Sequence, residues 1–186
     1  LLPGDSYRVR SNLAAPLAGD LRRAGSDYPV WVENAYLQLP SDFPRRIDRL
    51  AREITQSAGN PYDKAAAITS WLRANMQYER EAPAPPPGRD PVDWFLFEAR
   101  LGFCDYYASA AVLMLRSLGI PSRLAAGYAE GDFNPETGQY FVSEADLHSW
   151  PEVYFPGYGW IEFEPTASQP PLERAQGQSD GAELGG

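Results

Sequence analysis

The chain has 186 residues, of which 44% are hydrophobic and 22% are charged. This composition is that of a globular domain large enough to bury a sizeable core. The net charge of −9 and the lack of a basic run argue against nucleic acid as a partner. A single cysteine allows no disulfide within the chain, and no apolar run reaches the length that a membrane-spanning helix needs.

The sequence divides into three segments. Residues 1–40 mix short apolar stretches with turn formers, and we predict a β-type or irregular extension with weak strand character at 7–9 and 36–39. Residues 41–166 are predicted to form the core. Residues 167–186 are rich in Gly, Pro, Gln and Ser, which indicates a flexible linker or tail.

The core contains helices first and strands afterwards. One helix is predicted after Ser41 or Asp42, a second is capped by Asn60, and a third begins at Cys104 and ends before Gly119. Four strands are predicted at 123–128, 140–142, 152–155 and 160–164. Residues 132–138 only faintly resemble a calcium-binding loop and are interpreted as a hairpin tip. This order is typical of an α+β fold.

Cys104 is the first candidate for chemistry because it opens the third helix. A thiol at a helix N-terminus lies near free backbone N–H groups and the positive end of the helix dipole, and both favour the reactive thiolate. The alternative is a structural cysteine, since Cys104 also lies on the apolar stripe of its helix and free cysteines are often buried.

His148 is the only histidine, so a cysteine–histidine pair in this chain must join Cys104 to His148. A carboxylate would then orient the imidazole through Nδ1. Glu162 and Glu164 are the candidates, because a two-residue period places both on one face of the last predicted strand. The alternative is that the two carboxylates only form a solvated face.

Four blocks of sequence, in order, resemble the transglutaminase-like core of bacterial membrane-anchored proteins. The blocks are Gly-Phe-Cys104-Asp-Tyr-Tyr-Ala-Ser, Leu-Arg-Ser-Leu-Gly-Ile-Pro-Ser-Arg, His148-Ser-Trp-Pro-Glu-Val-Tyr-Phe-Pro and Gly-Trp-Ile-Glu-Phe-Glu164-Pro-Thr. With two further blocks at 36–40 and 90–97, the resemblance covers residues 36–166. Glu164 replaces the usual aspartate, and His-Ser-Trp followed by Pro151 replaces the usual His-Ala-Trp.

The resemblance implies a papain-like α+β fold, with the cysteine at the N-terminus of a central helix packed on an antiparallel sheet. It assigns catalysis to Cys104, His148 and Glu164, and Glu162 is kept as a fallback acid. The backbone N–H of Cys104 is a candidate oxyanion donor. The aromatic candidates for the oxyanion site or the walls of the cleft are Trp94, Phe97, Tyr107 and Trp150.

The implied function is transfer of an acyl group from a protein glutamine carboxamide, through a thioester, to a primary amine or to water. Two alternatives stay open: a cysteine protease or amidase with the same residues, and a catalytically silent binding or scaffold module. No cofactor or metal cluster is expected, and the expected partner is a protein or peptide substrate. The chain starts at Leu1, and we expect it to be an extracytoplasmic part of a longer protein embedded in a bacterial membrane.

Overall fold

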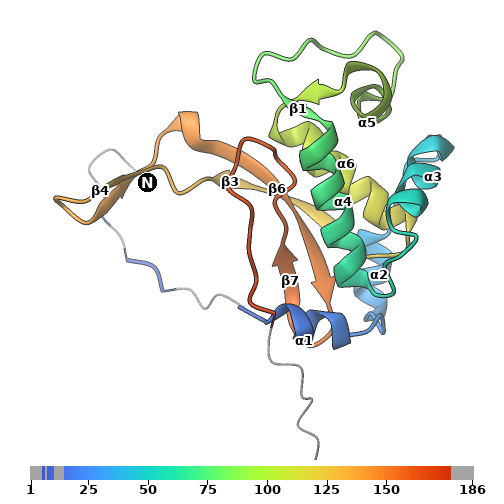
Figure 1. The fold of residues 1–186 in the computed structure, drawn as a ribbon, viewed down its shortest axis with the longest axis horizontal. Helices are drawn as coiled ribbons and strands as arrows, with labels where there is room; N and C mark the ends of the chain where they lie inside the picture. The colour runs from blue at the N-terminus through green and yellow to red at the C-terminus, as the bar shows by residue number, and fades with distance from the viewer. Residues whose placement is uncertain (1–5, 7, 11–14, 177–186) are drawn as a thin grey trace, which may run out of the picture.

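A computed structural model describes residues 6, 8–10 and 15–176. Its main layer is a three-stranded antiparallel sheet of order β3-β6-β7, covered on one side by helices (Figure 1). The strands are β3 (Ser122–Tyr128), β6 (Leu147–Phe155) and β7 (Gly159–Glu162). The predicted α+β architecture is therefore confirmed.

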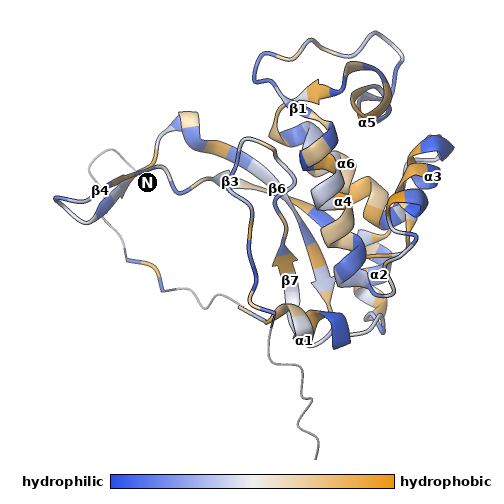
Figure 2. Cartoon of the chain, viewed as in Figure 1, coloured by the Kyte–Doolittle hydropathy of each residue, from blue (hydrophilic) through white to orange (hydrophobic). Residues whose placement is uncertain are grey.

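The central helix is α6 (Cys104–Ser117), which packs against β6 on one side and against α4 (Pro61–Asn75) and α3 (Arg45–Ile54) on the other. Its buried residues include Tyr107, Ala111, Met114 and Leu115. Figure 2 shows hydrophobic residues along α6, where it lies between the helices and the sheet. This position brings Cys104, the first residue of α6, close to the sheet.

The helices begin close to where capping rules place them. Asn60 caps α4, since its side chain accepts a hydrogen bond from the backbone N–H of Asp63, and Pro61 is the first helical residue. The helix expected after Ser41 or Asp42 instead begins at Arg45, with Pro44 at the capping position. Residues 41–42 form a turn before it.

The N-terminal part of the chain is helical where the sequence predicted strand or irregular structure. It contains α1 (Ala18–Arg23) and α2 (Val30–Tyr36), and Tyr36 ends α2 rather than starting a strand. Arg8 and Val9 lie in no strand, and Tyr7 is outside the described residues. Helices of six or seven residues contain too few turns to produce a clear hydrophobic period, and tertiary packing decides them instead.

A short parallel ladder leads to the cysteine. The strands β1 (Gln77–Tyr78) and β2 (Leu101–Gly102) pair, and between them lie α5 (Pro91–Trp94) and a π-helix, η1 (Phe95–Ala99). A Cβ on Gly102 would lie 2.9 Å from the Tyr106 ring and 3.1 Å from the Phe95 ring, so only glycine fits there. The chain thus reaches Cys104 through a closely packed turn.

Between β3 and β6 the chain forms a hairpin of β4 (Asp132–Asn134) and β5 (Gln139–Phe141), as predicted for 132–138, followed by the short 3₁₀-helix η2 (Glu144–Asp146). The hairpin projects from the body of the protein (Figure 1). Among the described residues, no helix has both the length and the apolar character required to cross a membrane.

Residues 167–176, predicted to begin a flexible tail, have no regular secondary structure but are held against the body. The backbone N–H of Ala18 donates to the Ala175 carbonyl at 2.9 Å, and Arg73 donates to the Gln169 carbonyl at 2.8 Å. Residues 177–186 of the predicted tail lie outside the described residues.

Candidate active site

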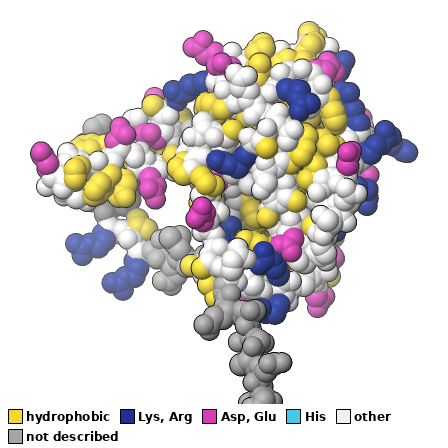
Figure 3. All heavy atoms as spheres, viewed as in Figure 1, with side chains coloured by type: hydrophobic (Ala, Val, Ile, Leu, Met, Phe, Trp, Pro, Cys, Tyr) yellow, Lys and Arg dark blue, Asp and Glu magenta, His cyan; other side chains and the backbone are white. Residues whose placement is uncertain are grey.

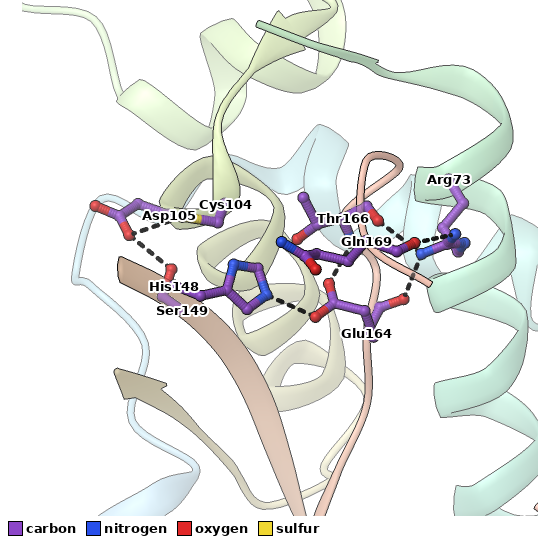
Figure 4. A network of polar contacts seen from close by, with 8 residues as sticks. All are labelled: Arg73, Cys104, Asp105, His148, Ser149, Glu164, Thr166 and Gln169. Carbon is purple, nitrogen blue, oxygen red and sulfur yellow. Dashed lines mark hydrogen bonds and ion pairs between the residues drawn. The ribbon is translucent and has the colours of Figure 1, made fainter. Parts of the chain in front are cut away.

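The side chains of Cys104, His148 and Glu164 converge from three parts of the fold (Figure 4). Cys104 is the first residue of α6, His148 lies near the start of β6, and Glu164 follows the end of β7. The antiparallel pairing of β6 with β7 places the histidine and glutamate strands side by side. The sheet thus brings His148 close to Glu164, 16 positions later in the sequence, and the packing of α6 against β6 adds Cys104, 60 positions before Glu164.

His148 Nε2 lies 2.6 Å from Glu164 Oε2, and both side chains are almost completely buried. The carboxylate thus contacts Nε2, and the contact with Nδ1 that was predicted from the sequence is wrong. The imidazole lies between Glu164 and Cys104 in Figure 4, so that Nδ1 is left for the thiol. The two ring nitrogens have different partners because α6 and the segment after β7 lie on opposite sides of the ring.

The ionisation of the pair is shifted toward its charged forms. Burial lowers the pKa of His148, but hydrogen bonds to Cys104 and Glu164 and their charges outweigh burial and raise it to about 9. Burial raises the pKa of the Cys104 thiol, but hydrogen bonds to His148 and Ser149 outweigh burial, so that the net shift is downward. This pattern favours a thiolate beside an imidazolium.

Glu164 is fixed by both of its carboxylate oxygens. Oε1 accepts a hydrogen bond from the backbone N–H of Thr166 at 2.8 Å, while Oε2 contacts His148. Arg73, on α4, donates to the backbone carbonyls of Glu164 and Thr166 at 3.2 and 2.6 Å. The segment that holds the acid is thus tied to the helical layer.

Glu162, the fallback acid, does not reach the histidine. It is the last residue of β7 and is exposed, whereas Glu164 is only 7% exposed. The regular strand ends at Glu162, so the two-residue period that would place both carboxylates on one face does not continue to Glu164.

Two further polar residues adjoin the thiol. Ser149 Oγ donates to Asp105 Oδ1 at 2.6 Å, and that oxygen lies 3.8 Å from Cys104 Sγ. The Asp105 charge acts to raise the pKa of the thiol, against the hydrogen bonds to His148 and Ser149. In the sequence, Ser149 stands out only as a departure from the family's usual alanine, and no pattern assigns a role to Asp105.

The thiol faces a cavity of about 500 Å³ that is lined by residues from α6, β3, η2 and β6. The lining includes Tyr78, Arg80, Phe103, Gln169 and the segment 144–149. None of the four aromatic cleft candidates is among the lining residues.

Each aromatic candidate packs elsewhere. Trp94 lies 6.5 Å from the Tyr106 ring, Phe97 lies under the Arg46 guanidinium, and Tyr107 is completely buried in the core. Trp150 stacks 6.0 Å from the His148 ring, in space that a side chain at Gly127 would occupy. Their helical or strand phase turns them toward the core or the imidazole rather than toward the open side of the thiol.

Within the described part of the chain, no group of three or more His, Cys, Asp or Glu residues is placed to hold a metal ion.

The fold and this site define an α+β protein of the papain-like class, with a cysteine at the start of its central helix. The sequence matches the family model of the transglutaminase-like superfamily over residues 48–165. The chain therefore belongs to the transglutaminase-like superfamily.

The chain is also similar to individual sequences and to a solved structure. The Bacillus subtilis protein YebA is 44% identical over 152 residues, which is 78% of this chain and 20% of that protein. A Pseudomonas aeruginosa protein-glutamine gamma-glutamyltransferase is 38% identical over 142 residues, 76% of this chain and 21% of that protein. The crystal structure of the periplasmic domain of TgpA from Pseudomonas aeruginosa, bound to ethylmercury, has a TM-score of 0.65 and 36% identity over 75% of this chain and 50% of that one. The chain spans about a fifth of the length of the curated relatives it matches.

Proposed function

We propose that the protein is a thiol acyltransferase that acts on glutamine carboxamides of proteins, with Cys104 as nucleophile and His148 and Glu164 as its partners. The observation that carries the proposal is the 2.6 Å contact of His148 with Glu164 beside a thiol whose pKa is lowered. The relative named as a protein-glutamine gamma-glutamyltransferase supports this choice of substrate.

In the first half-reaction, the Cys104 thiolate attacks the carboxamide carbon and the C=O electrons move onto oxygen. Cys104 is the first residue of α6, where a backbone N–H has no partner within the helix, and we assign to this N–H the donation to the oxyanion. When the C–N bond breaks, the His148 imidazolium gives its proton to the departing nitrogen, and ammonia leaves. The product is a thioester on Cys104.

In the second half-reaction, a primary amine attacks the thioester carbon and neutral His148 accepts a proton from it. The C–S bond breaks and the thiolate returns, beside an imidazolium that Glu164 stabilises. Water in place of the amine yields glutamate, so the same residues support deamidation. A peptide carbonyl in place of the carboxamide would make the protein a protease.

A direct test combines a short glutamine peptide with a fluorescent primary amine. We expect release of ammonia and equimolar incorporation of the amine, both abolished in Cys104→Ala. Ammonia without incorporation would indicate hydrolysis, and cleavage of the peptide bond would indicate a protease. Absence of all three, with an ordinary thiol reactivity at Cys104, would leave a binding or scaffold module.

The place of action belongs to the same proposal. The TgpA domain of known structure is periplasmic, and this chain aligns with half of it. We therefore place the chain on the extracytoplasmic face of a bacterial membrane, as part of a longer membrane-embedded protein. Fractionation of cells that express the whole protein, with protease accessibility of this domain in spheroplasts, tests the orientation.

A further inference from the structure

Exposed apolar side chains gather on the hairpin that joins β3 to β6. Each is between 51% and 61% exposed. This set, called the apolar arm below, comprises Tyr128, Phe133, Tyr140, Phe141, Val142 and Leu147. Figure 3 shows hydrophobic side chains clustered there on the projecting part of the protein. Scattered exposed hydrophobic residues are normal, but a cluster that costs solubility usually marks an interaction surface.

The apolar arm is continuous with the candidate active site. Tyr128 and Leu147 are opposite each other in the β3–β6 ladder, and Leu147 lines the cavity that contains Cys104. Further out, the Phe133 and Tyr140 rings lie 4.9 Å apart across the β4–β5 ladder. A polypeptide bound in the cavity would therefore contact the apolar arm where it leaves the cavity.

The charge around the arm selects among possible occupants. Between Arg123 and Arg174 the sequence contains no lysine or arginine. Five carboxylates lie between Tyr128 and Leu147, the first and last residues of the apolar arm: Glu130, Asp132, Glu136, Glu144 and Asp146. Arg80 reaches it from the body and donates to the Ala145 carbonyl at 2.7 Å. The surface is thus apolar and acidic, which disfavours an anionic membrane and also a second copy of a chain with net charge −9.

We infer that the apolar arm docks the polypeptide substrate, and that it selects segments in which apolar and basic side chains flank the reactive residue. This inference rests on the proposed function, since it names the kind of substrate that the same site would take. Apolar contacts with the aromatic residues supply affinity, and the carboxylates favour lysine and arginine in the docked segment.

The test compares Tyr140→Ser/Phe141→Ser with a matched control, Val30→Ser/Tyr158→Ser. The control residues are also exposed but lie on α2 and on the β6–β7 turn. Each variant is assayed with a glutamine dipeptide plus hydroxylamine, and with an unfolded basic polypeptide that contains glutamine. We expect the arm variant to lose about tenfold or more in kcat/KM on the polypeptide, through KM. Its dipeptide turnover should stay within about twofold of the parent, as should both activities of the control.

A second pair of measurements addresses charge. Glu130→Gln/Glu136→Gln should reduce the preference for the basic polypeptide over an acidic one of equal length, and should weaken its dependence on salt. The inference is overturned if the arm variant loses the two activities equally, or loses neither.

Binding separates failure of the inference from failure of the proposed function. If the parent does not turn over the dipeptide, the proposed function fails, but fluorescence anisotropy of the labelled basic polypeptide on Cys104→Ala still tests docking. Weaker anisotropy binding after the arm substitutions supports the inference. Binding that is unchanged overturns it, as does a dimer in sedimentation velocity, or adsorption to anionic vesicles, that the arm substitutions abolish.

Discussion

At Cys104, the proposed nucleophile, reactivity depends on the fraction of the thiol that is ionised at neutral pH. Its pKa is lowered from the ordinary 9.0, because hydrogen bonds to His148 and Ser149 outweigh burial. We therefore expect the pH dependence of the iodoacetamide alkylation rate to give an apparent thiol pKa below 9.0. In His148→Ala this pKa should rise toward 9.0, because the hydrogen bond to the imidazole is lost. The chain has one cysteine, so mass spectrometry of the intact protein reads this site alone. Superimposable profiles for parent and variant would contradict the pair.

Asp105 and Ser149 should tune the same thiol in opposite directions. Removing the carboxylate in Asp105→Asn should lower the thiol pKa, because its charge lies 3.8 Å from the sulfur. Ser149→Ala should raise the thiol pKa, because the side-chain hydrogen bond of Ser149 acts to lower it. Ser149→Thr keeps the hydroxyl and should restore the parent profile. The alkylation profile measures all three, and shifts of the same sign for the first two would refute this account.

Glu164 and Glu162 form a matched pair for testing the acid. Glu164→Gln keeps the size of the side chain but removes the charge that stabilises the imidazolium, and we expect kcat to fall by about 10²-fold or more. Glu162→Gln, on the exposed end of β7, should stay within about twofold of the parent. Ammonia release measures both variants. Equal losses would mean that the acid is misassigned.

At the scale of elements, one arginine of α4 holds the segment that carries the acid. Arg73 donates to the carbonyls of Glu164, Thr166 and Gln169, a three-point contact that the compact ammonium of lysine cannot reproduce. We expect Arg73→Lys to lower kcat about tenfold to a hundredfold, because small displacements of a positioned group are costly. Arg52→Lys on α3, whose arginine pairs with Asp48 near the surface, is the control. A similar kcat for Arg73→Lys and Arg52→Lys would show that Arg73 does not position Glu164.

Sequence patterns are sufficient to predict some of the helices, but not all of them. The helices α3, α4 and α6 bury a periodic face, and a capping side chain or a proline starts two of them, so that their existence follows from local sequence. The short helix α1 does not follow in this way, because its stability depends on tertiary contacts such as the packing of Ala18 and Leu21 into the core. The aromatic candidates do not line the cavity for a related reason, since local sequence does not state which face of an element a cavity will touch.

For the whole molecule, the raised pKa of His148 couples folding to pH. Its folded value is about 9 against 6.5 for the free side chain, so the protonated histidine stabilises the fold fully below pH 6.5. This contribution is lost as the pH rises from 6.5 through about 9. The lowered pKa of Cys104 acts in the opposite sense, since its contribution is lost as the pH falls through the folded value.

Denaturant unfolding at pH 6 to 10 tests this coupling in the Cys104→Ala background, in which Glu164 still acts to raise the pKa of the imidazole. The free energy of unfolding should decline above pH 6.5 in this background, and more steeply than in the additional variant His148→Gln. A difference between the two that is independent of pH would contradict a buried ion pair of His148 with Glu164.

The sequence by itself determined the class of fold, the central helix, and a lone cysteine and histidine that could pair only with each other. These follow from local periodicity, capping chemistry and counting. The tertiary structure decided which glutamate meets the imidazole and through which nitrogen. It also decided that Arg73 contacts Glu164 and that Asp105 lies beside Cys104. Those contacts join residues from different elements, and their geometry depends on where β7 ends and how α4 and α6 pack. No local pattern in the sequence predicts the geometry of these contacts.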